Sequence, residues 1–596
     1  MCIVFQYCFI FLNKLLLFPK GIREYCFFQK HYYPSADSIV KTEALAMPAQ
    51  VKLWFKNWPN QVPKSLKYPN VPLFQILKET AKSHPEKVAI AYLDREITYA
   101  DLDLLSDQFA AALVGLGVKK GDRVAIFLPN IPQFIIAYYG ILKAGAVLTA
   151  ISPMHREREV EYQLADSKAQ TIVTLDSLVP IVEAVRQRTK LKHVIVTNLE
   201  EYTNKTSPVL DKKPKAPNTY SFNELLKKDA LPPKVNINPA EDLAALQYTG
   251  GTTGTAKGAM LTHSNLVANA IAFASWIRGA EAKETFLAAL PLFHIYGMTT
   301  SMNVPIALSS KMVLLPKFEP AKALETIQKH RVTVFCGVPT MYQALLANPE
   351  LGKYDLTSIR VCISGASPLP PQVQRKFMQV TGGLLAEGYG LTEASPVTHC
   401  SPVDKTMKTV RVGSIGLPLP DTDAKIVDAE TGTKTLMQGE TGELAVKGPQ
   451  VMKGYWRKPE ETALVLRGGW LLTGDIARMD NDGYFYITDR KKDLIKTKDY
   501  SVYPREIEDV LYEHPAVRLC AVIGKPDPAA GEIPKAFVVL KEGTAASAQE
   551  ITAFVNGKLA PYKAIRELEF RKDLPLSSAG KVLRRSLRDE EIQKVR

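Results

Sequence analysis

Short apolar runs alternate with amphipathic helical segments from residue 88 onward, and this alternation leaves few folds open to the chain. Residues 99–118 repeat apolar side chains at helical spacing and close at Gly117. Residues 122–130 have the character of a buried strand, and the same order of helix and strand then recurs. Strands of this kind that are separated by helices predict a largely parallel sheet with helices on both faces.

The composition changes further along the chain. Residues 202–240 hold six prolines and seven lysines, which predicts a surface excursion. The alternation then resumes up to about residue 400, whereas residues 411–490 contain short strands bounded by Gly and Asp, typical of a small β-rich subdomain. The charged stretch 489–499 separates this part from a final module with its own strands and amphipathic helices, and a hinge is expected at such a boundary.

These patterns predict an α/β protein with three parts. We expect a large N-terminal domain of α/β sheets with a small β-rich subdomain over residues 47–489. A small, mobile α+β C-terminal domain is expected over residues 490–596. The remaining residues, 1–46, form an extension that differs from the rest of the chain.

The extension of residues 1–46 is apolar and aromatic. Asn13 and Lys14 interrupt its first apolar run, which leaves less than the roughly 20 residues that a membrane span needs. No basic region precedes the run and no small-residue cleavage site follows it, so a signal peptide is disfavoured. Sequence typical of a globular protein begins at Met47. Two interpretations stay open: a misassigned start upstream of Met47, and a weak membrane anchor.

Composition narrows the class of partner. With 46% apolar and 23% charged residues the chain is an ordinary globular protein, and its formal charge of +14 favours anionic partners. The basic residues are scattered, with no Lys/Arg block among aromatics, which favours phosphorylated small molecules over nucleic acid. Seven cysteines without a C-x-x-C pair favour a reducing compartment and no metal–thiolate site.

The stretch YTGGTTGTAKGAM at residues 248–260 has the character of a phosphate cradle. It places four glycines, four threonines and Lys257 in a loop with little side-chain bulk. Glycines let backbone N–H groups converge on an anion, hydroxyls add donors and the lysine adds charge. The P-loop pattern needs Ser or Thr after the lysine, but Gly258 stands there. A flexible linker is disfavoured, because a helix-like stretch follows at once.

Several separated motifs then follow one another in a fixed order. They are YTGGTTGTAKG, PLFHIYG (291–297), GYGLTEASP (388–396), GELAVKGPQVMKGYW (442–456), GWLLTGD (469–475), DRKKDLIK (489–496) and AGKVLRR (579–585). From about residue 60 to 590 the chain resembles the acyl-adenylate-forming enzymes, which include acyl-CoA synthetases, aryl-CoA ligases and firefly luciferase. The resemblance implies attack of a carboxylate on the α-phosphorus of ATP, followed by displacement of AMP by a thiol. It therefore implies ATP, Mg²⁺ and the co-substrate CoA.

The resemblance also implies roles for single residues in the nucleotide site. The Tyr389 ring lies along the adenine, Thr392 contacts the phosphate and Glu393 holds Mg²⁺. Asp475 accepts hydrogen bonds from the ribose, and Arg490 contacts the nucleotide. Further nucleotide-binding candidates are Thr249, Gly250, Gly251, Thr252, Thr253, Gly254, Lys257, Gly365, Ala366, Gly388 and Gly390.

Two lysines of the C-terminal module are implied to serve different steps. Lys581 enters the active site and stabilises charge on the α-phosphate during adenylation, but it would then obstruct the thiol. Rotation of the small domain about Lys492 solves this conflict in the family and turns the loop 496–503, with Lys496, toward the CoA channel. Asp499 stands where the family often has glycine, which is a departure that affects the expected CoA contacts.

The motifs are most similar to those of long-chain fatty acid–CoA ligases. His294 would lie at the mouth of the acyl pocket, which residues 335–342 and 363–368 would line. A 4-coumarate-like or medium-chain acid–CoA ligase is the alternative within the family. A fatty-acid transport protein, a luciferase-like oxygenase and a nucleic-acid-binding protein are alternatives from other classes. We expect a cytoplasmic protein that binds a fatty acid, ATP and CoA but no nucleic acid, and leave open peripheral membrane association and a homodimer.

Overall fold

The computed structural model describes most of the chain beyond residue 51. Contacts divide the chain into one unit of residues 1–51 and 65–69 and a second unit of residues 52–64 and 70–596, and every helix and strand named below belongs to the second. The described ranges are 52–203, 216–226, 231–249, 256–403, 410–497, 500–528, 530–577 and 581–595. The extension 1–46 therefore lies outside the described residues.

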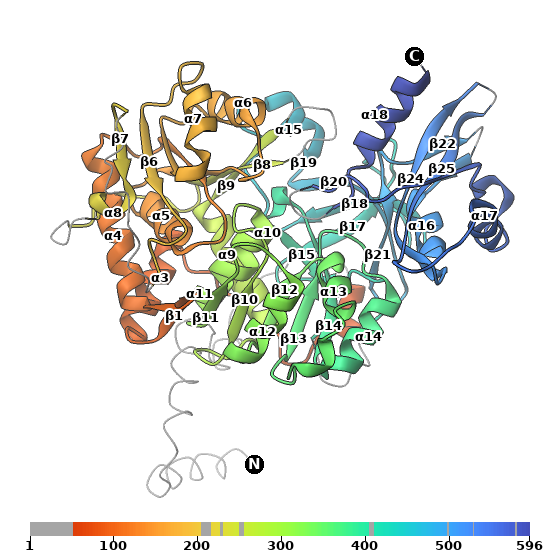
Figure 1. Cartoon of the computed structure of the whole chain (residues 1–596), viewed down its shortest axis with the longest axis horizontal. Helices are drawn as coiled ribbons and strands as arrows, with labels where there is room; N and C mark the ends of the chain where they lie inside the picture. Colours follow the sequence, from red (N-terminus) through yellow and green to blue (C-terminus); the bar gives the residue numbers. More distant parts are fainter. Residues whose placement is uncertain are drawn as a thin grey trace, which may run out of the picture. The chain divides into compact units, whose positions relative to one another are not determined.

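A seven-stranded sheet forms the first layer of the second unit (Figure 1). All its neighbouring strands pair in parallel except β8 and β9, which form a hairpin. In spatial order the strands are β7 (Thr219–Ser221), β6 (His193–Thr197), β5 (Thr171–Leu175), β3 (Arg123–Phe127), β4 (Val147–Ala150), β8 (Leu243–Thr249) and β9 (Lys257–Thr262).

Helices cover both faces of this sheet. On one face α6 (Glu157–Ser167) and α7 (Val179–Arg186) share an apolar core with β3, β5 and β6. On the other face α5 (Pro132–Lys143) is entirely buried and packs against β3, β4 and α4 (Tyr99–Gly115). A capping box between Thr98 and Asp101 begins α4. The helix and strand order expected from residue 88 onward is confirmed here.

A nine-stranded sheet forms the second layer. Its six central strands pair in parallel, and antiparallel strands close both ends. In spatial order they are β16 (Leu417–Pro418), β15 (Val397–Cys400), β14 (Leu384–Gly390), β13 (Val361–Ser364), β12 (Val334–Gly337), β10 (Thr285–Ala288), β11 (Lys311–Leu314), β1 (Val88–Tyr92) and β2 (Arg95–Thr98).

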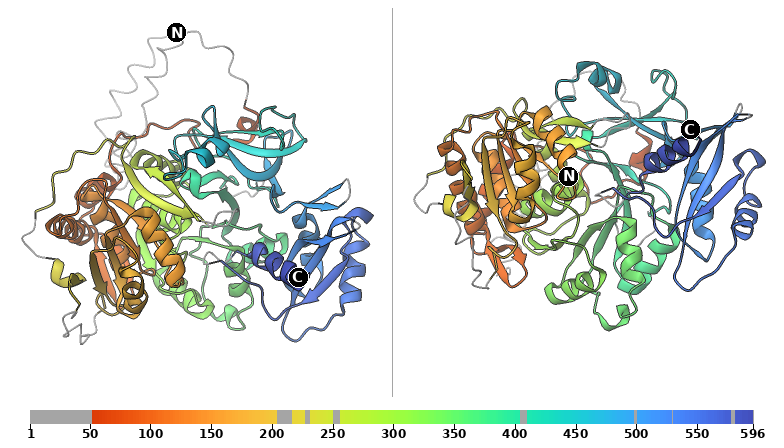
Figure 2. Two further views of the ribbon diagram at one scale, coloured as in Figure 1. Left: turned by 90° about the horizontal axis from the view of Figure 1, so that it is seen from above. Right: turned by 45° about the horizontal axis from the view of Figure 1, so that its top comes forward.

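The two sheets stack with helices between and outside them, as the views in Figure 2 show. One face of the nine-stranded sheet carries α12 (Pro320–His330), α13 (Pro339–Leu346) and α14 (Pro371–Thr381) over a common apolar core. The other face lies toward α3 (Leu73–Ser83), α9 (His263–Trp276), α10 (Ile295–Met298), a π-helical turn (Thr299–Asn303) and α11 (Val304–Ala307). The alternation in the sequence did not indicate which strands belong to which sheet, because a strand's pattern does not encode its partner.

The expected surface excursion over residues 202–240 is wrong for part of its length. Residues 219–221 form β7 at the edge of the first sheet, and α8 (Phe222–Leu225) follows directly. The Phe222 ring is fully buried and stacks on Phe109 of α4 at 4.9 Å between ring centroids. The proline-rich composition hid this short buried segment.

A third, antiparallel sheet of five strands confirms the expected β-rich subdomain. Its strands are β17 (Asp423–Val427), β18 (Thr441–Lys447), β19 (Leu466–Arg467), β20 (Trp470–Met479) and β21 (Phe485–Arg490), with α15 (Pro459–Val465) beside them. Short 3-10 helices lie between the longer elements, at Leu53–Asn57, Asp176–Leu178, Leu351–Lys353, Thr392–Ala394 and Pro561–Lys563.

The C-terminal part has its own sheet and core, so its α+β class is as expected. The strands are β22 (Ile495–Thr497), β23 (Tyr500–Val502), β24 (Val517–Asp527), β25 (Gly531–Leu540) and β26 (Glu567–Phe570). The helices are α16 (Pro504–Glu513), α17 (Ala548–Asn556) and α18 (Arg584–Val595). An apolar cluster joins this sheet to α16 and α17. Among the described residues, no helix is both long and apolar enough to cross a membrane.

Gly416, which precedes β16, provides a test of the packing. Its φ is +87°, and a Cβ there would lie 2.1 Å from backbone atoms of Cys400 and Ser401. Gly439 has a similar φ of +84°, but no atom of the described residues lies within 4 Å of its Cβ position. We expect Gly439→Ala to lower the free energy of unfolding by about 1–2 kcal/mol through the left-handed backbone alone. Gly416→Ala should cost a further ~1–3 kcal/mol through overlap.

Thermal unfolding midpoints of the two variants check this prediction. Equal midpoints for Gly416→Ala and Gly439→Ala would show that the backbone near Cys400 yields without cost.

Candidate active site

A cavity of about 1700 Å³ collects side chains from the seven-stranded sheet, the nine-stranded sheet and the small antiparallel sheet, and from the start of α18. It lies at the ends of the β8–β9 hairpin, β13, β14 and β20, and it reaches the segment that follows β21. Most of the residues expected at the site line it. They are Thr249, Lys257, His294, Gly365, Ala366, Gly388, Tyr389, Gly390, Thr392, Glu393, Asp475, Arg490, Lys492 and Lys581.

Six of the expected residues are not placed in the cavity. Lys496 is exposed on β22 and does not line it. The other five, Gly250, Gly251, Thr252, Thr253 and Gly254, lie outside the described residues.

The β8–β9 hairpin carries the two ends of the expected phosphate loop. Thr249 ends β8 and Lys257 begins β9, and the two residues are direct partners in the antiparallel register. The Lys257 Nζ lies 5.2 Å from the centroid of the Tyr455 ring, within the range of a cation–π contact. Helix α6 supports the hairpin, because the Tyr248 hydroxyl donates to Asp166 Oδ2 at 2.5 Å. Both ends of the loop are therefore held at the cavity wall.

Tyr389 lies between two glycines that allow close backbone packing at the end of β14. A Cβ at Gly390 would lie 2.1 Å from the Pro396 carbonyl oxygen, and one at Gly388 would lie 2.9 Å from Ile363. No larger residue fits at Gly390 without movement of the backbone. The strand can therefore turn the Tyr389 ring into the cavity.

Asp475 joins Tyr389 to the small sheet. Its Oδ2 accepts a hydrogen bond from the Tyr389 hydroxyl at 2.6 Å, and its Oδ1 lies 3.3 Å from Arg490 Nε. Asp475 on β20 and Arg490 on β21 are direct partners in the antiparallel register. Burial, and then the Asp475 carboxylate, raise the pKa of Tyr389 well above its usual value. The Tyr389 hydroxyl thus stays protonated as a donor, and the carboxylate stays available to a polar ligand.

Thr392 and Glu393 lie in a 3-10 turn just after β14. Glu393 Oε1 accepts a hydrogen bond from the Tyr455 hydroxyl at 2.7 Å. Among the described residues, no group of three or more His, Cys, Asp or Glu side chains could hold a metal ion. One carboxylate suits Mg²⁺ only if the ion's other ligands are phosphate oxygens and water. The site thus fits a cation that arrives with a nucleotide.

His294 and Lys581 come together from distant parts of the chain. The His294 Nδ1 accepts the Tyr296 N–H at 3.3 Å, which caps α10. Burial, and then the charge of Lys581, lower the pKa of His294 to about 4, so its ring is neutral at pH 7. Burial and the charge of Arg490 lower the pKa of Lys581 to about 7. Burial and Arg490 also lower the pKa of Lys492, to about 8.

The expected acyl-pocket segments divide between two cavities. Ile363, Gly365 and Ala366 line the large cavity, but no residue of 335–342 does. Pro339 and Thr340 line a second cavity of about 180 Å³, together with Ala366, Ser367 and Pro368. The large cavity has apolar walls at Phe273, Phe293 and Val397 instead.

Sequence reasoning missed several supporting residues. Tyr455, which holds Glu393, lies inside the motif 442–456, but no residue of that motif was singled out. Glu443 in the same motif accepts the Gly474 N–H at 2.9 Å and pairs with Lys491 at 2.9 Å. The hydrogen bond and the ion pair of Glu443 together fix the backbone beside Asp475. The motif 442–456 could have pointed to Glu443, because a buried acid next to glycines indicates a structural role.

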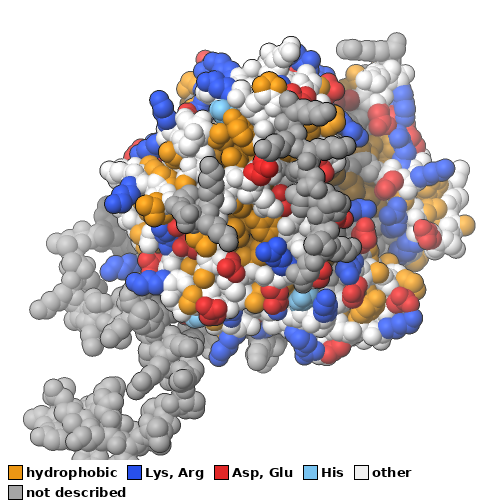
Figure 3. Space-filling model, turned by 60° about the vertical axis from the view of Figure 1, so that its left-hand side comes forward, with side chains coloured by type: hydrophobic (Ala, Val, Ile, Leu, Met, Phe, Trp, Pro, Cys, Tyr) orange, Lys and Arg blue, Asp and Glu red, His pale blue; other side chains and the backbone are white. Residues whose placement is uncertain are grey.

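The arrangement is that of a nucleotide-binding enzyme. A threonine- and lysine-edged hairpin meets an aromatic ring, a fixed carboxylate and a set of cationic side chains in one cavity. The charges of the described face in Figure 3 are interspersed, with no single basic field gathered over it. A phosphorylated small molecule fits such a cavity better than nucleic acid does.

Comparison with known proteins identifies the family. Residues 77–456 match the AMP-binding enzyme family, and residues 506–581 match the AMP-binding enzyme C-terminal domain. The chain belongs to the AMP-binding enzyme family.

Relatives and solved structures agree with this assignment. The chain is 46% identical over 555 residues to a long-chain-fatty-acid–CoA ligase of Bacillus subtilis (strain 168), covering 91% of this chain and 98% of the relative. It is similar to ATP-bound MatB from Rhodopseudomonas palustris, with a TM-score of 0.79, 32% identity and coverage of 89% and 100% of the two chains. It is also similar to the anthranilate CoA ligase AuaEII in complex with anthranoyl-AMP, with a TM-score of 0.80, 29% identity and coverage of 89% and 99%.

The low pKa of Lys581 predicts an unusual reactivity at neutral pH. An ordinary lysine has a pKa near ~10.4 and is charged at pH 8, whereas Lys581, with a pKa of about 7, is mostly uncharged there. We expect acylation of Lys581 by trace acetic anhydride to reach half its maximum near pH 7. Lys572, exposed in the same domain, is the comparison. Isotope-coded labelling read by peptide mass spectrometry measures both, and parallel pH profiles for the two lysines would contradict the prediction.

Proposed function

We propose that this enzyme activates a fatty acid as its acyl-adenylate and transfers the acyl group to CoA, releasing AMP and pyrophosphate. The observation that carries the proposal is the presence of Lys581, from the C-terminal part, in the same cavity as Tyr389 and Asp475. A protein that only binds a nucleotide, without activating an acid, has no need of a lysine delivered from the C-terminal part. The long-chain-fatty-acid–CoA ligase of Bacillus subtilis supports a long-chain acid as substrate, and a 4-coumarate-like or medium-chain acid is the less supported alternative.

The nucleotide is held by groups with complementary chemistry. The Tyr389 ring offers a flat face to the adenine, since its hydroxyl is already engaged by Asp475. The second carboxylate oxygen of Asp475, beside Arg490, is the acceptor for the ribose hydroxyls. The loop 249–257, with Lys257 at its end, holds the phosphates that leave as pyrophosphate. Thr392 contacts the α-phosphate.

The first step forms a mixed anhydride. A carboxylate oxygen of the acid attacks the α-phosphorus, and the bond to the β-phosphate oxygen breaks, so the electron pair leaves with pyrophosphate. The reaction needs positioning and charge neutralisation more than covalent help. The bound phosphate and carboxylate favour the protonated form of Lys581, and its ammonium then offsets their charge where they meet. Glu393 would hold Mg²⁺, which would neutralise the phosphate charge.

The acid enters beside His294. The neutral ring of His294 and the apolar walls at Phe273, Phe293 and Val397 suit an alkyl chain next to the reacting carboxylate. Gly365 lets the Tyr296 ring pack closely against this wall, because a Cβ there would lie 3.0 Å from the ring. We infer that such contacts would hold the carboxylate at the α-phosphate rather than in solvent.

The second step needs a different arrangement. The CoA thiolate attacks the acyl carbonyl, and the bond to AMP breaks with the electron pair on the AMP phosphate. Lys581 occupies the cavity that the thiol must enter. We infer that residues 490–596 rotate as a domain against residues 47–489, with Lys492 at the pivot. Lys496, exposed in the present arrangement, then faces CoA.

Release of AMP with a graded panel of acids tests the proposal. The enzyme should exchange labelled pyrophosphate into ATP in the presence of an acid and without CoA, and palmitate should support faster exchange than hexanoate or 4-coumarate. The complete reaction should release AMP. Accumulation of ADP, or exchange that is independent of the acid, would contradict the mechanism.

Single-lysine variants separate the two half-reactions. Lys581→Ala should slow adenylate formation by about 10²-fold or more, the scale of a lost transition-state charge, and leave thioester formation from preformed acyl-adenylate nearly unchanged. Lys496→Ala should do the opposite, because that side chain lies outside the present cavity. Lys492→Pro restricts φ at the pivot and should preserve adenylation while thioester formation falls. Equal losses in both half-reactions for Lys581→Ala would mean that one fixed arrangement serves both steps.

A further inference from the structure

The linker between β21 and β22 is bridged by a buried cluster of charged side chains. β21 belongs to the small sheet and ends at Arg490, and β22 belongs to the C-terminal sheet and begins at Ile495. Asp489 lies at the end of β21, and its side chain is only 1% exposed. Its backbone is fixed to the small sheet, because Asp489 is the register partner of Ile476 on β20. This carboxylate therefore belongs to the N-terminal side of the linker.

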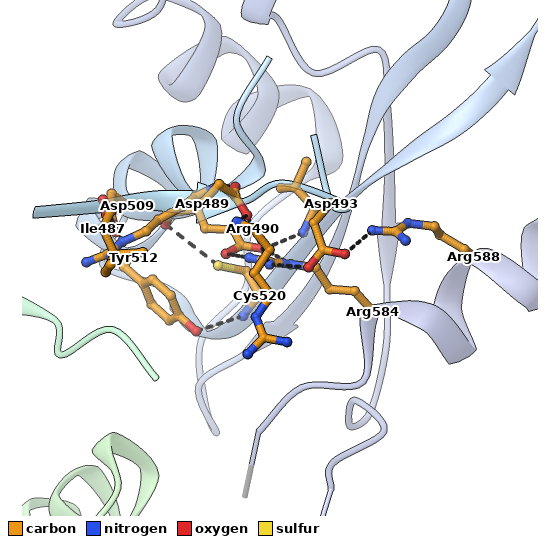
Figure 4. A network of polar contacts seen from close by, with 12 residues as sticks. Ile487, Asp489, Arg490, Asp493, Asp509, Tyr512, Cys520, Arg584 and Arg588 are labelled. Carbon is orange, nitrogen blue, oxygen red and sulfur yellow. Dashed lines mark hydrogen bonds and ion pairs between the residues drawn. The ribbon is translucent and has the colours of Figure 1, made fainter. Parts of the chain in front are cut away.

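Arg584 approaches Asp489 from the C-terminal side. Its guanidinium binds the Glu508 carboxylate through both Nε and Nη2, while Nη1 lies 3.2 Å from Asp493 Oδ2 and 3.5 Å from Asp489 Oδ1. Figure 4 shows Arg584 between Asp489 and Asp493, with Arg588 on the far side of Asp493. Glu508 on α16 and Asp493 beyond Lys492 share a domain with Arg584, so of its three carboxylate partners only Asp489 lies across the linker.

Asp489 also completes the first turn of α16. The first N–H groups of a helix have no partner within the helix, and Tyr503 at the start of α16 supplies no side-chain cap. The Arg505 N–H is one of these groups, and it donates to Asp489 Oδ2 at 2.8 Å. The Arg505 side chain donates to the Ile487 carbonyl of β21 at 2.8 Å. A residue of the small sheet thus caps a helix of the C-terminal domain.

The contacts of Asp489 with Arg584 and with the Arg505 N–H exist only in the present orientation of the C-terminal domain. Burial, opposed in part by Arg584 and reinforced by Glu508, raises the pKa of Asp489 to about 6, so the carboxylate is ionised at pH 7. A buried carboxylate is tolerated when a cation and N–H donors satisfy it. Rotation about Lys492 would take Arg584 and the Arg505 N–H away together, because both move with α16 and α18. Asp489 would keep only the Arg490 N–H, at 2.7 Å.

The same short segment links this cluster to the reacting groups. Arg584 follows Lys581 by three residues, and Lys581 lies in the large cavity. The Lys581 N–H donates to Ser577 Oγ at 3.1 Å, and the Lys581 carbonyl accepts the Ser577 N–H at 2.7 Å. These bonds hold the Lys581 backbone to the segment before α18 and not to the small sheet. The anchoring of Arg584 on Asp489 therefore favours the orientation in which Lys581 is in place.

We propose that Asp489 is a latch across the linker, a positioning residue that stabilises the adenylating orientation by binding Arg584 and by capping α16 at the Arg505 N–H. This inference rests on the proposed two-step function and assigns the residue that sets the balance between the steps. Loss of the latch shifts the population toward the orientation that admits CoA. Adenylation then slows, and transfer to CoA does not.

Separate assays of the two half-reactions test the latch. Asp489→Asn removes the charge and keeps an acceptor, whereas Asp489→Ala removes both. We expect acid-dependent pyrophosphate exchange with palmitate to fall by about tenfold in Asp489→Asn and further in Asp489→Ala, the scale of coupling between contacting charged groups. Thioester formation from preformed palmitoyl-adenylate and CoA should be unchanged or faster. Glu508→Gln is the matched control, because it removes a contact of the same guanidinium without crossing the linker, and it should alter both half-reactions alike.

Hydrogen exchange gives a readout that does not depend on turnover. In the full-length enzyme with a non-reactive palmitoyl-sulfamoyl adenosine, addition of CoA should speed exchange at the Arg505 N–H. The Val522 N–H donates to Glu508 Oε1 at 2.7 Å within the C-terminal domain, so its exchange should stay constant. In Asp489→Ala the Arg505 N–H should exchange fast without CoA, and intact protection at Val522 shows that the domain is folded.

The outcomes distinguish the latch from the function on which it rests. A wild-type enzyme without acid-dependent pyrophosphate exchange would contradict the proposed function. An active wild type whose Asp489 variants lose both half-reactions by the same factor would overturn the latch alone. The latch would also be overturned if Glu508→Gln reproduced the split between the half-reactions, or if the Arg505 N–H stayed protected in Asp489→Ala.

Discussion

The Asp475 carboxylate is the interaction on which the candidate site depends most. It binds the Tyr389 hydroxyl at the end of the nine-stranded sheet and Arg490 at the end of the small sheet. One buried acid thereby fixes two sheets at one point of the cavity wall, and Glu443 fixes the backbone beside it. Because Arg490 is the last residue of β21, the same contact also sets where the linker to the C-terminal sheet begins.

A series of charged side chains runs from Asp475 in the small sheet to Arg584 in the C-terminal domain. Arg490 is held by Asp475, and its charge helps to lower the pKa values of Lys492 and Lys581. Further along, Arg584 neutralises Asp489. Lys492 and Lys581 therefore line the cavity with lowered pKa values, whereas Arg584 and Arg588, which also line it, are paired with carboxylates. Such a division suits a site that must neutralise phosphate charge and then release it.

Local pattern predicted the elements and a phosphate-binding loop at residues 248–260, and it failed where distant segments meet. The strand and helix alternation gave β3, α5 and β4 correctly, since period and burial are local properties. The partition of strands between two sheets, the buried Phe222 and the Tyr455–Glu393 hydrogen bond all depend on tertiary neighbours that no local pattern encodes. Lys581, like Tyr389, Glu393 and Asp475, was expected only through the family resemblance, because a lysine near the C-terminus is ordinarily a solvated charge. The residue roles and the domain bounds stay predictions.

The glycines around Tyr389 restrict how such an enzyme can diversify. Gly390 has the Pro396 carbonyl where a side chain would begin, and Gly388 has Ile363 there. A side chain at Gly390 therefore requires movement of the backbone, whereas Phe273, Phe293 and Val397 on the apolar wall can change in size without adding a Cβ to the backbone. An evolutionary lineage that accepts a new acid must therefore change its acyl wall while the adenine wall stays constant. The acid that the enzyme accepts can then change while the nucleotide that it binds stays the same.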